Sequence, residues 1–134
     1  MSAFFDTNIL IYAFSTDTRR ERALNTIAGG GVISAQVLNE FTNVLRKKQR
    51  QDWSVVEAAV QSIRFRFPDI VPITADTHAA AIALARDHTL AFYDALIVAT
   101  ALEAGCNSLY SEDLQHGRSL GGLTIVNPFL QSMP

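Results

Sequence analysis

The sequence predicts an α/β protein in which helices flank a mainly parallel central sheet, in three layers of the order α/β/α. Short apolar runs typical of strands alternate with longer stretches in which apolar residues recur at helical spacing. Of the 134 residues, 49% are hydrophobic and 18% are charged. This length and composition predict one globular domain over residues 1–134, with enough apolar side chains for a substantial core.

The first strand is expected at residues 3–5 and the second at 32–33. A helix over 17–28 lies between them, with Asp17 or Thr18 as its cap and three glycines at its end.

Two further helices follow the second strand. Ser34 caps the first of them, and its apolar face is formed by Val37, Leu38, Phe41, Val44 and Leu45. Ser54 caps the next, which runs over 55–67 and ends at Pro68.

The second half of the chain is expected to add an extended segment, two helices and two strands, over residues 70–73, 76–87, 93–104, 108–110 and 123–126. The helix over 93–104 is apolar on nearly all sides, which predicts that it is central and buried.

The formal net charge of −2 hides an asymmetry along the chain. Residues 1–66 carry nine Lys and Arg against six Asp and Glu, whereas residues 67–134 carry two against seven. This balance disfavours a generally basic nucleic-acid binder, so a nucleic acid would have to be held locally. Cys106 is the only cysteine, which excludes an internal disulfide and favours a reducing cytoplasm. Neither a signal peptide nor a membrane-spanning run is recognisable, and no membrane association is expected.

Four acidic residues lie in separated parts of the chain, each at the edge of an apolar segment: Asp6, Glu40, Asp94 and Asp113. Residues that follow parallel strands or begin helices can meet at one edge of a sheet. Four carboxylates in one place repel each other unless a cation lies between them, and an all-oxygen donor set suits Mg²⁺ or Mn²⁺. Such ions activate water and offset the charge of a phosphodiester. The arrangement therefore indicates a metal-dependent nuclease.

The first two acids also have structural explanations. Asp6 ends the first strand and is equally suited to cap a helix that starts near Asn8. Glu40 lies just outside the edge of the apolar stripe of its helix. Its carboxylate is therefore either half-buried and functional or directed to water.

The last two acids are ambiguous in the same way. Asp94 begins the buried helix, where the helix macrodipole favours an acid whatever its function. Asp113 and Glu112 both follow the strand at 108–110, so only one of them is expected to face the site. The alternative is a plain acidic turn.

The motifs around these acids resemble a PIN domain in their order. They are Asp6-Thr7-Asn8 after a strand, Glu40 on a helix, Asp94-Ala95-Leu96-Ile97 at the start of a buried helix, and Ser111-Glu112-Asp113 after a late strand. The resemblance covers about residues 3–129. In its small size the chain is similar to the VapC-type ribonuclease toxins of prokaryotic type II toxin–antitoxin pairs.

This resemblance implies that the four acids are the catalytic and metal-binding residues, with Mg²⁺ or Mn²⁺ as cofactor. Asn8 and Ser111 match the polar residues that support the first and last acids. Glu112 departs from the pattern, and we assign it a supporting role beside Asp113.

The resemblance also implies an RNA substrate and a cognate antitoxin, with an antitoxin arginine entering the acidic cleft. The high apolar content and the resemblance together predict a homodimer, formed through the helices over 17–28 and 55–67. The densest basic group either contacts RNA phosphates or complements the end of its helix, and consists of Arg46, Lys47, Lys48 and Arg50.

Other functions remain open from the residues alone. A receiver-like phosphoacceptor domain or a phosphatase would also be α/β and use Mg²⁺, but both need a lysine late in the chain, and no lysine follows Lys48. A catalytically silent binding module of the same shape is a third alternative.

Overall fold

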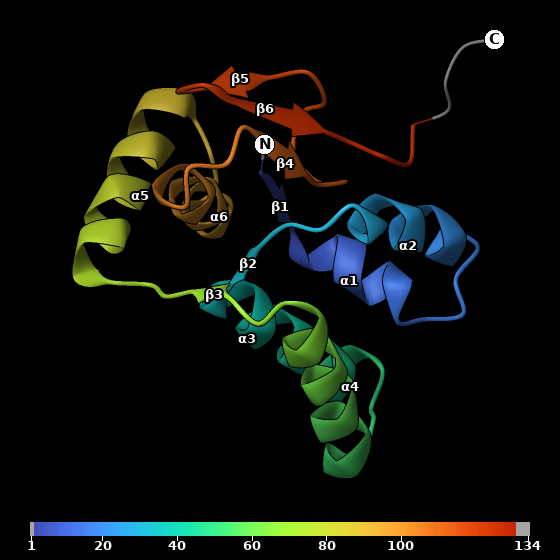
Figure 1. Ribbon diagram of the computed structural model, residues 1–134. Coiled ribbons are helices and arrows are strands. Elements are labelled where there is room, and N and C mark those ends of the chain that lie inside the picture. The colour runs from blue at the N-terminus through green and yellow to red at the C-terminus, as the bar shows by residue number, and fades with distance from the viewer. Residues whose placement is uncertain (1, 131–134) are drawn as a thin grey trace, which may run out of the picture.

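The structure is a computed structural model that describes residues 2–130. A four-stranded sheet lies at its centre (Figure 1). The spatial order of its strands is β1 (Ala3–Phe5), β4 (Ser108–Tyr110), β6 (Leu123–Val126) and β5 (Ser119–Leu120). The first three are parallel, and β5 runs antiparallel to β6. Phe5 pairs with Tyr110, so the chain leaves β1 and β4 at the same edge of the sheet.

A second, two-stranded parallel sheet continues the first one. It consists of β2 (Ile33–Ser34) and β3 (Ile70–Val71). Val32 forms a parallel bridge with Phe4. This bridge brings the end of β2 to the edge where β1 and β4 end.

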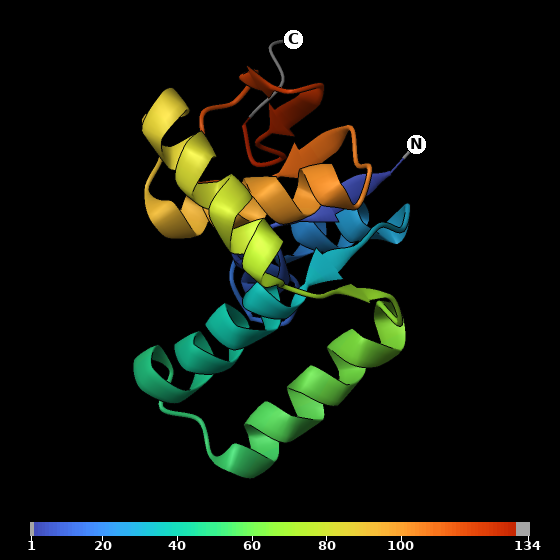
Figure 2. The same ribbon diagram turned by 90° about the vertical axis from the view of Figure 1, so that its left-hand side faces the viewer.

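The helices surround the sheet, which confirms the predicted α/β class with three layers. They are α1 (Thr7–Ala13), α2 (Arg20–Ala28), α3 (Ala35–Asn43), α4 (Trp53–Arg66), α5 (Ala75–His88) and α6 (Phe92–Glu103). A π-helical turn, η1 (Val44–Lys48), continues α3 without a break. In Figure 1, α5 and α6 lie on one side of β1, and α1 and α2 lie on the other. Figure 2 shows α3 and α4 as a pair of helices that projects from the sheet.

The core is built from the strands and from the helix faces that cover them. Fully buried apolar side chains include Phe4, Leu10, Ile33, Phe41 and Leu109. Every residue from 95 to 101 on α6 is buried as well, as predicted for this helix. Removing these side chains from water is the main driving force for this arrangement, at about 25 cal/mol per Å² of apolar surface.

Several predicted boundaries are wrong, and local polar contacts explain where α2 and α5 begin. Helix α2 begins at Arg20 rather than near Asp17, since the Asp17 carboxylate binds the backbone N–H and the guanidinium of Arg19 instead of capping the helix. Helix α4 begins at Trp53, so Ser54 lies inside it.

Helix α5 begins at Ala75 after Thr74, which forms a capping box with Thr77. Strand β2 is displaced by one residue from its predicted place, and the two-residue strand β5 was not predicted. Ser34, in contrast, caps α3 as expected, by accepting a hydrogen bond from the backbone N–H of Val37. No helix within residues 2–130 is long and apolar enough to cross a membrane.

Candidate active site

Asp6 lies between β1 and α1, and it takes the capping role considered for it. Its Oδ1 accepts a 2.7 Å hydrogen bond from the backbone N–H of Thr7, so the side chain caps α1. Its Oδ2 accepts a 2.7 Å hydrogen bond from the Ser111 hydroxyl. The residue is only 5% exposed. Burial raises the pKa of Asp6 from 3.8 to about 7, against the opposing effect of these two hydrogen bonds. The charges of Glu40 and Asp113 contribute to the increase.

Glu40 approaches Asp6 from α3 and is half-buried, as its place beside the apolar stripe predicts. The Thr7 hydroxyl donates to its Oε1 at 2.5 Å, and Gln36 donates to its Oε2 at 3.2 Å. Thr7 therefore binds both acids, Asp6 through its backbone N–H and Glu40 through its hydroxyl.

Asp94 lies in the first turn of α6 and is also half-buried. Desolvation raises its pKa, and the charges of Asp113 and Glu40 raise it further. Asp94 lines the same pocket as Glu40 and Asp113. The helix macrodipole favours the ionised form at this position.

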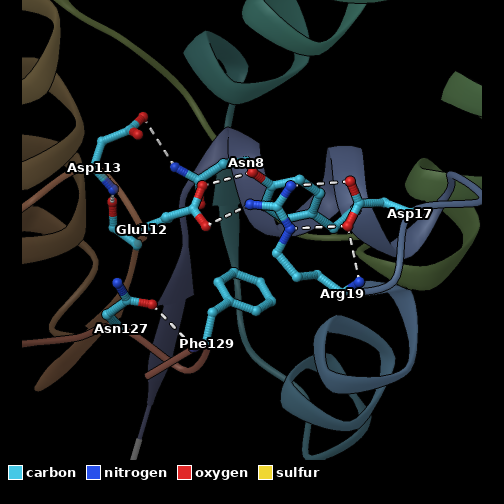
Figure 3. A network of polar contacts seen from close by, with 9 residues as sticks. Asn8, Asp17, Arg19, Glu112, Asp113, Asn127 and Phe129 are labelled. Carbon is cyan, nitrogen blue, oxygen red and sulfur yellow. Dashed lines mark hydrogen bonds and ion pairs between the residues drawn. The ribbon is translucent and has the colours of Figure 1, made fainter. Parts of the chain in front are cut away.

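Asp113 and Glu112 point in different directions, as Figure 3 shows. Asn8 donates a 3.0 Å hydrogen bond to Oδ2 of Asp113, and its own carbonyl oxygen accepts the backbone N–H of Glu112 at 3.1 Å. The Glu112 carboxylate instead accepts a 2.5 Å hydrogen bond from the Tyr12 hydroxyl and pairs with Arg19 at 3.0 Å.

Arg19 is the centre of a polar network beside the site. It binds the Asp17 carboxylate at 2.8 and 3.0 Å, and its guanidinium carbon lies 4.0 Å from the centroid of the Tyr12 ring. The hydrogen bonds from Arg19 lower the pKa of Asp17 to about 2. Arg19 also compensates the charge of Glu112. This ion pair holds the Glu112 carboxylate apart from that of Asp113 (Figure 3).

All four predicted acids line one pocket of about 500 Å³, together with Thr7, Asn8, Asn43 and Lys48 among others. Glu112 does not line it. The side chains of this lining that could bind a metal offer oxygen atoms only, most of them from carboxylates, which suits Mg²⁺ or Mn²⁺. In the described part of the chain, however, no three His, Cys, Asp or Glu side chains form a ready-made metal site. An ion in this pocket would therefore need bridging waters or small side-chain movements, as Mg²⁺ commonly does.

The predicted basic group is only partly at the site. Lys48 lines the acidic pocket, at the end of η1. Arg46 lies over the Trp53 ring at 4.3 Å and donates to the carbonyl of Gln51. Lys47 and Arg50 are exposed and do not line the pocket.

The sequence interpretation missed several residues that hold the acids in place. Thr7 and Gln36 bind Glu40, while Tyr12 and Arg19 bind Glu112. The contact between Gln36 and Glu40 could have been predicted, because Gln36 precedes Glu40 by about one helical turn. The other contacts join elements that are distant in sequence, and no local pattern indicates them.

One known family matches most of the chain. The PIN domain family matches residues 3–118. The chain belongs to the PIN domain family. A search of curated protein sequences finds no match.

Solved structures similar to this PIN domain include a chain of a toxin–antitoxin complex from Klebsiella pneumoniae. The two chains are 27% identical with a TM-score of 0.73, and the match covers 96% of this chain and 98% of that one. VapC20 of Mycobacterium tuberculosis, a toxin that cleaves the sarcin–ricin loop, is 23% identical with a TM-score of 0.65, over 84% and 90% of the two chains. VapBC2 of Rickettsia felis, bound to a promoter DNA fragment, matches at 16% identity and a TM-score of 0.68, over 93% and 97%.

Proposed function

We propose that this PIN-domain protein is a VapC-type toxin, an endoribonuclease that cleaves RNA with Mg²⁺ or Mn²⁺ and is inhibited by a cognate antitoxin. The observation that carries the proposal is the convergence of Asp6, Glu40, Asp94 and Asp113, from four separate parts of the chain, on one pocket. The similarity to a chain of a toxin–antitoxin complex along nearly the full length of both chains supports the biological setting.

The four carboxylates would hold the ion, directly or through water. When bound, the ion supplies activation of the attacking water and offsets the negative charge of the phosphate. The burial of Asp6 fits this role, because a carboxylate whose pKa is raised to about 7 is poorly compensated by the protein alone. A cation in the pocket would supply the missing positive charge.

The chain's own polar residues would keep these carboxylates in place. Ser111 and Thr7 fix the two oxygens of Asp6, and Asn8 fixes Asp113. Such contacts orient ligands for a metal. Lys48, which lines the same pocket, would contact a phosphate of the RNA backbone. We expect the protein to act in the cytoplasm, where the buried thiol of Cys106 stays reduced.

The direct test is cleavage of a labelled single-stranded RNA by the purified protein with Mg²⁺, with Mn²⁺ or with EDTA. Cleavage in the presence of either ion and none in EDTA is the expected result. Activity that survives EDTA would refute the metal-dependent mechanism. A folded protein without activity under all three conditions would instead favour the catalytically silent PIN-shaped module. The family match argues against a receiver or phosphatase domain.

The antitoxin is proposed to lie across a surface groove and to place an arginine among the acids, since bidentate pairing suits a carboxylate. Expression of this chain alone should arrest growth, and co-expression of the neighbouring gene should restore it. Expression of soluble, folded protein without growth arrest would contradict the toxin assignment and leave the nuclease assignment standing.

A homodimer is proposed through α2 and α4. Helix α4 carries large exposed apolar side chains, with Trp53 56%, Val55 45% and Phe65 90% exposed. A surface of this kind favours a symmetric contact between two copies. Sedimentation at micromolar concentration should show a species about twice the 14.7 kDa chain mass. A sole species at the chain mass would rule the dimer out.

A further inference from the structure

We propose that a second pocket, beside the acidic one, is a nucleobase-binding subsite in which a base of single-stranded RNA stacks on Tyr93 and is hydrogen-bonded by side-chain amides of α3. The pocket has a volume of about 570 Å³ and is lined by Gln36, Asn39, Glu40, Asn43 and Tyr93. The inference rests on the proposed ribonuclease function, because it assigns the substrate contact of the same site.

The two pockets are contiguous. Glu40 and Asn43 line both of them. Tyr93 lines the second pocket and is followed directly by Asp94, which lines the acidic one. A nucleotide whose phosphate lies among the acids can therefore place a neighbouring base over Tyr93.

The amides form a continuous stripe on α3. Gln36, Asn39 and Asn43 follow one another at spacings of three and four residues, which puts them on one face of the helix together with Glu40, four residues after Gln36. Gln36 uses one N–H to bind Glu40 and keeps its carbonyl oxygen. Among residues 2–130, no protein group is hydrogen-bonded to the side chain of Asn39 or Asn43. Each free amide offers a donor and an acceptor, as the edge of a base requires.

Tyr93 provides the stacking surface. The residue is 62% exposed, although it lies between two partly buried residues at the start of α6. Its ring meets Phe92 at an angle of 66° with centroids 5.6 Å apart, so one side is supported while most of the residue stays in contact with solvent. Exposed aromatic rings of this kind are the usual platform for unpaired bases.

The charge of the second pocket favours a base over a phosphate. Its lining contains the carboxylate of Glu40 and no lysine or arginine, whereas the acidic pocket includes Lys48. A phosphate would be repelled there unless a cation intervened, but a neutral planar group with donors and acceptors matches the lining. The two pockets therefore divide the substrate, with phosphate at one and base at the other.

The test measures binding of a short fluorescein-labelled single-stranded RNA by anisotropy in Mg²⁺. All proteins carry Asp113→Asn, which removes an acid outside the second pocket so that the RNA is bound without being cleaved. Three variants probe the ring: Tyr93→Phe keeps the aromatic face, Tyr93→Leu keeps apolar bulk without it, and Tyr93→Ala removes both. Ile82→Ala, which truncates a 50% exposed side chain on α5, is the control elsewhere on the surface.

We expect the leucine and alanine variants to bind about 5- to 100-fold more weakly, as loss of one stacked base predicts. The phenylalanine variant and the Ile82→Ala control should bind like the parent. The same RNA with abasic sugars should bind the parent and Tyr93→Ala equally. 2-Aminopurine is then placed at successive positions of the RNA. At one position its fluorescence should be quenched by the protein with Asp113→Asn alone and by Tyr93→Phe, but not by Tyr93→Leu or Tyr93→Ala.

The failures of the two proposals are distinguishable. If the protein that carries Asp113→Asn alone did not bind RNA, the ribonuclease assignment and the subsite would both be overturned. RNA binding that is insensitive to all three Tyr93 variants would overturn the subsite and leave the ribonuclease assignment standing. If the same variants instead weakened only the antitoxin complex, the pocket would belong to a protein partner.

Discussion

The Ser111 hydroxyl donates a 2.7 Å hydrogen bond to Oδ2 of Asp6, a contact between residues 105 positions apart in the sequence. It forms because β1 and β4 are neighbouring parallel strands in register, and the chain leaves both at one edge of the sheet. The same hydroxyl accepts the backbone N–H of Asp113 at 3.2 Å. Ser111 therefore links the first and last acids of the site.

Ser111→Ala should destabilise the metal-free protein by about 1.5–3 kcal/mol where Asp6 is ionised, because a buried carboxylate loses a hydrogen bond. The loss should be smaller near pH 5, where Asp6 is already protonated, since its pKa is about 7. Urea denaturation at pH 5 and pH 8 measures both values. Ser54→Ala, an exposed serine on α4, is the control. Equal losses at both pH values would show that the hydroxyl does not interact with the Asp6 charge.

The stability of the metal-free protein should fall as pH rises from about 4 to about 7. The pKa of Asp6 is about 7 in the folded state against 3.8 normally, so the folded state binds more protons in this range. The difference corresponds to about 4 kcal/mol at most. Asp94, whose pKa is also raised, acts in the same direction. Asp17 acts in the opposite direction, but only below about pH 4, because its pKa is lowered to about 2.

Melting temperatures across this range, for the parent and Asp6→Asn in EDTA, check the prediction. Asp6→Asn should remove most of the fall in melting temperature between pH 4 and pH 7. Mg²⁺ should raise the melting temperature of the parent protein at pH 8. A parent whose stability rises from pH 4 to pH 7 would contradict the burial of an uncompensated carboxylate.

Asp113→Asn should impair RNA cleavage more than Glu112→Gln. Asp113 lines the pocket, whereas Glu112 does not line it and pairs with Tyr12 and Arg19. Loss of a supporting contact typically costs about 10- to 100-fold in metal affinity or activity, which sets the upper limit for Glu112→Gln. Its stability cost should stay below about 1 kcal/mol, because the ion pair is partly exposed and screened. Comparison of kcat/KM for the two variants decides the order, and the reverse order would make Glu112 the functional acid.

The choice between these neighbours shows where sequence reasoning ends. The sequence predicted the three layers from its alternation of strand-like and helical segments. It also placed Asp6 after the first strand, Glu40 beside the apolar stripe of its helix and Asp94 at the start of the buried helix, as the structure has them. It could not orient Glu112, whose direction depends on Arg19, 93 positions away. It also placed the start of α2 at Asp17, because Asp is a favoured capping residue. The sequence does not show which of two local contacts forms, the helix cap or the Asp17–Arg19 ion pair.

Lys48→Ala should weaken RNA binding and reduce its salt dependence. One phosphate contact to single-stranded nucleic acid contributes about 0.7 to the slope of log K against log salt concentration. The slope should fall by about 0.7 in Lys48→Ala, because Lys48 lines the pocket. It should stay unchanged in Lys47→Ala, because Lys47 does not line the pocket. The measurement is a salt titration of RNA binding in the Asp113→Asn background. Equal slopes for the two variants would remove Lys48 from the substrate contacts.

The most direct test of the account is RNA cleavage by four carboxylate variants, Asp6→Asn, Glu40→Gln, Asp94→Asn and Asp113→Asn, measured beside two matched controls. Asp76→Asn removes an exposed acid from the first turn of α5, as Asp94→Asn does from α6, and Glu57→Gln removes an exposed glutamate from α4. The account predicts that every site variant folds and that each loses Mg²⁺-dependent cleavage, whereas both controls cleave like the parent. An Asp6→Asn or Asp94→Asn variant as active as the parent would contradict it.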